Sequence, residues 1–93
     1  MHQKNIIGPR IKTARKESHM SQMGLAAKLQ VMGIVIDRSA IAKVETGRRP
    51  VSDIEIAAIS RILNVQIEWL FAQSGDWFKQ FAEQQLDSLD GKD

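Results

Sequence analysis

The sequence contains no cysteine, no tyrosine and only five aromatic side chains among its 93 residues. Without cysteine, disulfide bonds cannot hold the fold together, and a thiolate metal site is excluded. The longest apolar run, residues 31–36, is interrupted by Gly33 and is far too short to span a bilayer. The first residues lack the apolar stretch of a secretory signal, so we expect a cytoplasmic protein without a membrane segment.

Candidate metal ligands and catalytic groups are equally scarce. His2 and His19 lie far apart in the sequence, and neither is paired with a second histidine or a carboxylate at a helical spacing. Zinc requires several such ligands to converge. Ser/His and Cys/His dyads, paired catalytic carboxylates and glycine-rich phosphate loops are not recognisable either. We therefore expect no metal, no cofactor and no enzymatic activity.

Charge is distributed unevenly along the chain. The net charge is +2, but residues 1–50 carry ten Lys and Arg against three acids, whereas residues 51–93 carry three against eight. The two parts therefore have formal charges of +7 and −5. A basic half joined to an acidic half favours a protein with one face for a polyanion and another turned away from it.

Apolar residues recur with helical spacing and no stretch alternates as a strand would, which predicts an all-α fold. Ser21, Asp37 and Ser52 are suitable N-caps, the last within a capping-box pattern, while Gly33 and Gly47 are expected to end helices. These signals predict helices over about residues 7–18, 22–32, 38–46, 53–63, 65–71 and 77–89. The residues expected to face inward are Ile7, Ile11, Ala14, Ser18, Leu25, Ala26, Leu29, Ile41, Val44, Ile62, Ile67, Leu70 and Phe71.

A series of residues also has a characteristic order and spacing: Ile11, Arg15, Ser21, Gln22, Leu25, Ala26, Ser39, Ile41, Glu45, Gly47, Arg48, Ala57, Leu63, Asn64, Val65, Trp69 and Leu70. Together they resemble the phage-repressor (Cro-like) helix-turn-helix family, also called the xenobiotic-response-element family, over about residues 6–72. The resemblance implies a five-helix, lambda-repressor-like domain, to which this chain adds a C-terminal helix. It also implies a sequence-specific regulator of transcription whose partner is a double-stranded DNA operator.

The resemblance places the base contacts on the third helix, at Arg38, Ser39 and Lys43. An arginine there can donate two hydrogen bonds to the O6 and N7 atoms of guanine. Gln22 opens the second helix, where its amide and the free backbone N–H groups can bind a phosphate. The phosphate contacts are expected from Gln22, Arg48, Arg49 and Arg10.

Arg15 and Glu45 have a different implied role. In the family, the corresponding side chains pair across the first and third helices, partly out of solvent. Carried over, this pair is a structural clamp rather than a DNA contact. Removing one partner of a buried pair is costly because the other charge is stranded.

The turn of the motif departs from the family pattern. The usual turn has about three or four residues, but here eight residues, 30–37, separate Leu29 from Arg38. We therefore expect a helix-turn-helix domain over residues 1–75, with its motif at about 22–46 and an extended turn at 30–37. Such an extension can shift the recognition helix relative to the DNA.

Residues 76–93 form a separate segment, with an amphipathic pattern and an acidic end. Three of the five aromatic residues fall in it. Its apolar side can complete the core of the monomer or form a dimer seam, and the sequence leaves both readings open. A homodimer is expected because one recognition helix covers only a few base pairs. The dimerisation candidates are Ile67, Trp77, Phe78, Phe81 and Leu86.

Two other functions remain open at the level of sequence. An antitoxin would repress its own operon through such a domain and neutralise a toxin through its tail. A protein-interaction module would retain the fold without binding DNA, although the basic residues at the expected positions disfavour this reading. The favoured prediction is a repressor that acts by occupying an operator.

Overall fold

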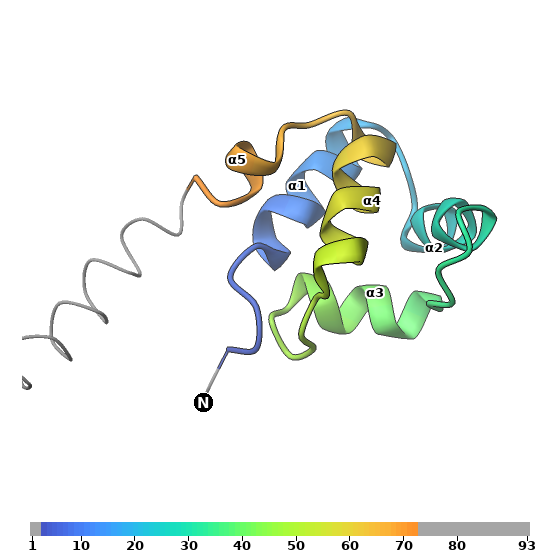
Figure 1. Cartoon of the computed structure of the whole chain (residues 1–93), viewed down its shortest axis with the longest axis horizontal. Coiled ribbons are helices and arrows are strands. Elements are labelled where there is room, and N and C mark those ends of the chain that lie inside the picture. Colours follow the sequence, from blue (N-terminus) through green and yellow to red (C-terminus); the bar gives the residue numbers. More distant parts are fainter. Residues whose placement is uncertain (1–2, 73–93) are drawn as a thin grey trace, which may run out of the picture.

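The computed structural model describes residues 3–72, and the fold there is built from helices alone (Figure 1). In order they are α1 (Gly8–Glu17), α2 (Gln22–Val31), α3 (Arg38–Glu45), α4 (Asp53–Leu63) and α5 (Ile67–Leu70). The predicted all-α class is therefore confirmed. None of these helices combines the length and the apolar character that crossing a membrane requires.

The three predicted N-caps are confirmed. The side chains of Ser21 and Asp37 accept the backbone N–H three residues further on, at 2.9 and 2.8 Å. At the start of α4, Ser52 Oγ accepts the N–H of Glu55 at 3.1 Å, and a Glu55 carboxylate oxygen accepts the N–H of Ser52 at 2.9 Å. Each cap satisfies backbone donors that lack a partner inside the helix, so these starts follow from local sequence.

The helix ends use left-handed residues. Gly33 and Gly47 have φ angles of 86° and 78°, as predicted after α2 and α3, and Asn64 ends α4 with a φ of 55°. His19 adopts the same region, with a φ of 56°, just after α1. Only glycine enters this region without a steric penalty from Cβ. The left-handed backbone conformation of His19 therefore does not follow from its residue type.

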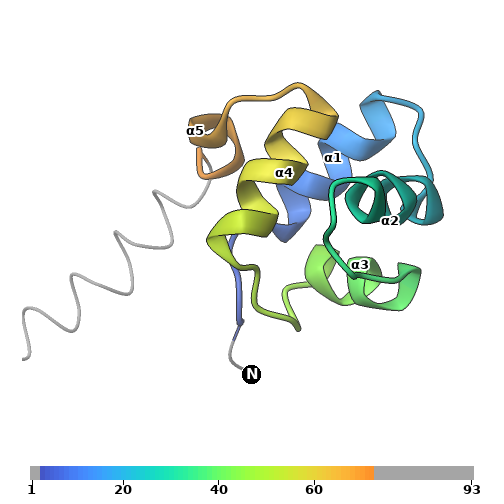
Figure 2. The ribbon, with the colours of Figure 1, turned by 45° about the vertical axis from the view of Figure 1, so that its right-hand side comes forward.

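The five helices are arranged so that α3 is held from one side. α2 and α3 pack against each other and α1 packs on α3, while α4 packs on α1 and α2 (Figure 2). α5 packs on α1 and α4, and in both views it lies at the opposite end of the molecule from α3. One side of α3 is consequently left open.

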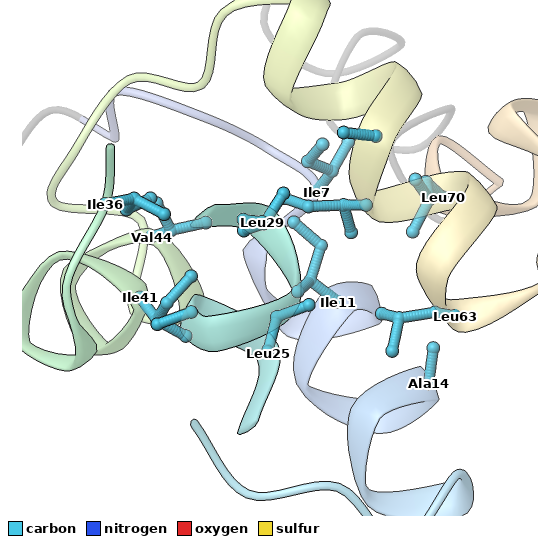
Figure 3. Close-up of a cluster of buried hydrophobic side chains, with 13 residues drawn as sticks. Ile7, Ile11, Ala14, Leu25, Leu29, Ile36, Ile41, Val44, Leu63 and Leu70 are labelled. Atoms are coloured by element: carbon cyan, nitrogen blue, oxygen red, sulfur yellow. The ribbon is translucent and has the colours of Figure 1, made fainter. Parts of the chain in front are cut away.

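A single apolar core joins these helices (Figure 3). Most of the predicted core is confirmed, including Ile7, Ile11, Leu25 and Leu29, which are almost completely buried. The buried apolar residues are Ile7, Ile11, Ala14, Leu25, Ala26, Leu29, Ile36, Ile41, Val44, Ala58, Ile59, Leu63 and Leu70.

Two inward predictions, Ser18 and Ile67, were wrong, and Ile62 and Phe71 are only partly buried against the core. The prediction missed four buried residues: Ile36, Ala58, Ile59 and Leu63. Ile59 is fully buried, whereas Ile62 is only partly buried, because α4 directs the Ile59–Leu63 row inward. Ile67 is 42% exposed, since it is the first residue of a single helical turn whose inward residue is Leu70. Ser18 is exposed because the helix has already ended there.

The connector between α2 and α3 comprises residues 32–37. α2 ends at Val31, one residue before the predicted end of the helix, and the first two residues of the predicted turn 30–37 belong to α2. Ile36 is buried in the core, while Val35 beside it is 95% exposed. The Gln30 amide also donates to the carbonyl of Ile36 at 3.0 Å. The extra residues are therefore anchored at the point where α3 begins.

Candidate DNA interface

The open side of α3 carries the three predicted base-contact residues. Arg38 and Ser39 lie in its first turn and Lys43 lies one turn further, and all three are exposed. Ile41 and Val44, on the other side, are fully buried. The helix therefore presents one polar, cationic row while its apolar row fixes it to the core.

The C-terminal end of α3 is fixed by a buried ion pair. Arg15 Nε lies 2.6 Å from Glu45 Oε2, and a terminal guanidinium nitrogen donates to Glu45 Oε1 at 3.0 Å. The remaining terminal nitrogen donates to the carbonyl of Met20 at 2.8 Å. The hydrogen bonds with Glu45 raise the pKa of Arg15 above its ordinary value, so the guanidinium stays charged. The structure thus contains the clamp between α1 and α3 that the resemblance implied.

Gln22 joins this cluster. Its amide nitrogen donates to Glu45 Oε1 at 3.1 Å, which links the start of α2 to the end of α3. The side chain is partly buried, and it lies at the helix N-terminus where backbone N–H groups are free. A role for Gln22 at a DNA phosphate stays a prediction, and it would use the second N–H of the amide nitrogen or the free backbone N–H groups, because a phosphate oxygen only accepts hydrogen bonds.

The basic loop after α3 separates its two arginines. Arg48 is exposed, and its Nε donates to the Thr46 hydroxyl at 3.2 Å. Arg49 instead forms two hydrogen bonds of 3.1 Å with the carboxylate of Glu55. These bonds raise the pKa of Arg49 and hold the pKa of Glu55 below its ordinary value. Of the two predicted phosphate contacts, Arg48 has the more available guanidinium.

Arg10 lies against α5. Its Nε donates to the carbonyl of Trp69 at 3.1 Å, and its guanidinium carbon lies 3.9 Å from the centre of the Trp69 ring. Such a cation–π contact stabilises the packing of α5 on α1. The structure therefore engages the Arg10 guanidinium with Trp69 of α5, and its predicted phosphate contact stays a prediction.

Of the five dimerisation candidates, only Ile67 lies among the described residues. Trp77, Phe78, Phe81 and Leu86 lie outside the described residues, as does the predicted helix that carries them. Ile67, the remaining dimerisation candidate, is exposed on α5. Within residues 3–72, no three His, Asp or Glu side chains gather as metal ligands.

Asn5 was missed by the sequence analysis although it contacts the loop after α3. Its amide donates to the backbone carbonyls of Val44 and Arg49 at 2.9 and 2.8 Å. The available signal was an asparagine shortly before the first helix, a position where such side chains commonly bond to backbone groups. That signal indicates a turn, but not a contact with residues some forty positions away.

The fold and the open face of α3 define a helix-turn-helix domain. The helix-turn-helix family model matches residues 11–70, so the chain belongs to the Cro/C1-type helix-turn-helix family. Members of this kind are sequence-specific DNA-binding regulators of transcription, and this chain is one of them. No curated protein sequence matches the chain significantly.

The solved structures similar to this chain include a controller protein and a repressor. The restriction-modification controller protein C.AhdI from Aeromonas hydrophila is 32% identical, with a TM-score of 0.60 over 70% of this chain and 87% of that one. The P22 c2 repressor protein, solved with synthetic operator 9T in the presence of Tl+, is 23% identical, with a TM-score of 0.59 over 71% and 92%. The second likeness supports the fold, and the first supports the family as well.

Proposed function

We propose that the protein binds an operator in duplex DNA as a homodimer, with α3 in the major groove, and represses transcription by occupying that operator. The observation that carries the proposal is the open cationic row of α3, opposite a buried row and a buried clamp. An α-helix with its side chains is about 10–12 Å across, which matches the major groove width of about 12 Å. α3 therefore fits the groove as a rigid element.

The residues of the proposed interface have two roles, contacts with base edges and contacts with the DNA backbone. Arg38 lies in the first turn, where the motif directs side chains towards base edges, and its fork matches guanine. Ser39 and Lys43 complete the reading surface. Arg48, just beyond the helix, supplies a backbone contact together with the start of α2 at Gln22.

The dimer follows from the size of one reading surface. A single recognition helix covers only a few base pairs, and half-sites one helical turn apart require two copies. Ile67 supplies an exposed apolar residue on α5, at the end of the molecule away from α3. The proposed seam would combine it with Trp77, Phe78, Phe81 and Leu86.

The experiment that tests DNA binding is selection of bound sequences from a random DNA pool, followed by affinity measurements over a salt series. A dimer with about three to five phosphate-neutralising cations per subunit gives a log–log slope of very roughly −5 to −9. The recovered half-site spacing also reports the dimer. A slope near zero, or no binding at low salt, would contradict the proposed function.

Two substitutions separate base contacts from backbone contacts. Arg38→Ala should relax sequence preference at one base position and cost about 1–3 kcal/mol on the preferred site. Arg48→Ala should weaken preferred and random DNA alike and make the salt slope shallower. Arg61→Ala is a matched control, since it removes an exposed cation from α4, a helix outside the proposed interface.

The oligomeric state is tested by sedimentation of the full-length chain. The proposed seam predicts that Trp77→Ser and Phe81→Ser shift the protein from dimer to monomer while circular dichroism keeps its helical signal. Loss of helical structure in both variants would mean that the segment completes the monomer. An unchanged dimer would place the interface elsewhere.

A further inference from the structure

Asn5 makes four hydrogen bonds with one side chain. Its Oδ1 accepts the backbone N–H groups of Ile7 and Gly8 at 3.1 and 2.7 Å, where α1 begins. Its Nδ2 donates to the carbonyls of Val44 and Arg49 at 2.9 and 2.8 Å. One amide therefore connects the start of α1, the end of α3 and the loop that follows α3.

Neighbouring contacts reinforce this connection. The backbone N–H of Lys4 donates to the carbonyl of Gly47 at 2.8 Å. Gly8 is buried against the end of α3 so closely that a Cβ atom there would collide with the carbonyl oxygen of Val44. Residues 4–8 therefore lie directly along the backbone of residues 44–49.

The segment held in this way contains Arg48. The carbonyls of Gly47 and Arg49, on either side of Arg48, both accept hydrogen bonds from residues 4 and 5. Gly47 has a φ of 78°, and a glycine at this place gives the loop many alternative conformations when nothing fixes it. The side chain of Arg48 itself remains exposed.

We infer that Asn5 is a positioning residue for DNA binding: it fixes the backbone on both sides of Arg48, so that the Arg48 guanidinium meets a DNA phosphate without first being ordered. This inference rests on the proposed function. Ordering a flexible loop during association reduces affinity, and a loop fixed beforehand avoids that cost. Asn5 acts through the backbone and does not itself contact the nucleic acid.

Asn5→Asp isolates the part of the side chain that holds the loop. The substitution keeps the shape and the acceptor for Ile7 and Gly8, and it places a carboxylate favourably at the start of a helix. It removes the donor to Val44 and Arg49. The protein used is the full chain, and the probe is a random-sequence DNA duplex at low salt, because a phosphate contact is independent of sequence.

The expected result is a loss of affinity that depends on Arg48. Asn5→Asp should weaken binding by about tenfold in the parent and by less than about twofold in an Arg48→Ala background, since contacts that act through one group are not additive. It should also make the salt slope shallower by about one for each subunit, as loss of one phosphate contact does. Gln66→Glu adds the same charge at an exposed position before α5, outside this loop, and should leave both quantities near the parent values.

Other outcomes separate this inference from the proposed function. Equal losses in the parent and Arg48→Ala backgrounds, or no loss at all, would overturn the positioning role while DNA binding stands. A parent chain that binds no duplex would instead contradict the proposed function. Should Asn5→Asp fail to fold, the neutral and shorter Asn5→Ser replaces it in the same cycle. Failure of both variants to fold would show that Asn5 is only structural, and would also overturn the inference.

Discussion

Two Arg–Glu pairs within residues 3–72 have nearly the same hydrogen-bonding chemistry and very different surroundings. Arg15 and Glu45 have side chains that are 9% and 2% exposed, and their shortest N···O distance is 2.6 Å. Arg49 and Glu55 are 30% and 12% exposed, and their distance is 3.1 Å. Each guanidinium donates two hydrogen bonds to its carboxylate.

The two ion pairs also connect different parts of the fold. Arg15 and Glu45 connect α1 with α3 across thirty residues of sequence, and the pair extends to Met20 and Gln22. Arg49 and Glu55 connect a loop with the start of the next helix, six residues away. Glu55 already belongs to the capping box of α4, so its position is set locally as well.

The difference teaches how environment determines the value of an ion pair. When one partner of a buried pair is removed, the other charge stays in a medium that cannot solvate it. When one partner of a partly exposed pair is removed, water takes its place at little cost. The first pair should therefore contribute strongly to how firmly the end of α3 is held, in addition to its buried apolar row, and the second should adjust the loop that follows α3.

The largest expected effect is that of Arg15→Ala. Because Glu45 would be left buried and unpaired, the free energy of unfolding should fall by about 3–5 kcal/mol. Urea denaturation followed by circular dichroism measures this quantity. Lys16→Ala, which removes the exposed cation next in sequence, is the matched control and should remain close to the parent. A variant that melts like the parent yet fails to bind DNA would mean that Arg15 contacts the nucleic acid.

A smaller effect is expected from Arg49→Ala. The free energy of unfolding should fall by about 1 kcal/mol, since the pair is partly solvated and Glu55 keeps its bond to the Ser52 N–H. The salt dependence of DNA binding then tests the sequence prediction that Arg49 contacts phosphate. If the Arg49 guanidinium is held by Glu55, Arg49→Ala leaves the salt slope at the parent value, whereas Arg48→Ala makes the slope shallower. Equal reductions for both variants would restore Arg49 as a phosphate contact.

The second pair also predicts a pH dependence. Hydrogen bonds from Arg49 hold the pKa of Glu55 below its ordinary value of 4.5. A carboxyl group with a lowered folded-state pKa contributes stability that is present above its unfolded pKa and lost as the pH falls through the folded value. The stability gap between the parent and Arg49→Ala should therefore be constant near neutral pH and close under acid conditions. Urea midpoints over a pH series measure the gap, and a gap that persists in acid would contradict the assignment.

Local signals in the sequence were sufficient for the helix boundaries and most of the core. The caps at Ser21, Asp37 and Ser52 depend on side chains within three residues, and helical spacing identified Leu25, Leu29 and Ile41 without knowledge of their neighbours. Ile59 and Ile62 were confused because both belong to an apolar stretch of α4. Only the packing of that helix on α1 and α2 decides which row faces inward.

The candidate interface was less predictable, because it depends on partners distant in sequence. The positions of Arg38, Ser39 and Lys43 follow from the periodicity of one helix. The commitment of Arg10 to Trp69 and the bonds from Asn5 to the loop after α3 do not, since they join residues 59 and up to 44 positions apart. From the sequence alone, a basic side chain that is free to bind DNA could not be distinguished from one that is bonded to another part of the protein.

The smallest expected effect concerns His19. In the sequence this residue lies between Arg15 and Met20, whose carbonyl accepts a hydrogen bond from the Arg15 guanidinium. His19 has a φ of 56°, and the next residue, Met20, gives its carbonyl to Arg15. His19→Gly removes the steric cost of Cβ in this conformation but adds backbone freedom to the unfolded chain, so a net gain of about 0.5 kcal/mol in the free energy of unfolding is expected. Asn64→Gly is the matched control: its φ is 55°, but asparagine tolerates the left-handed region well, so the gain there should be smaller. Urea denaturation of both variants beside the parent measures the two gains. If His19→Gly were instead destabilising, the left-handed turn would be fixed by contacts of the imidazole, and the Arg15 cluster would extend further into the connector than its hydrogen bonds indicate.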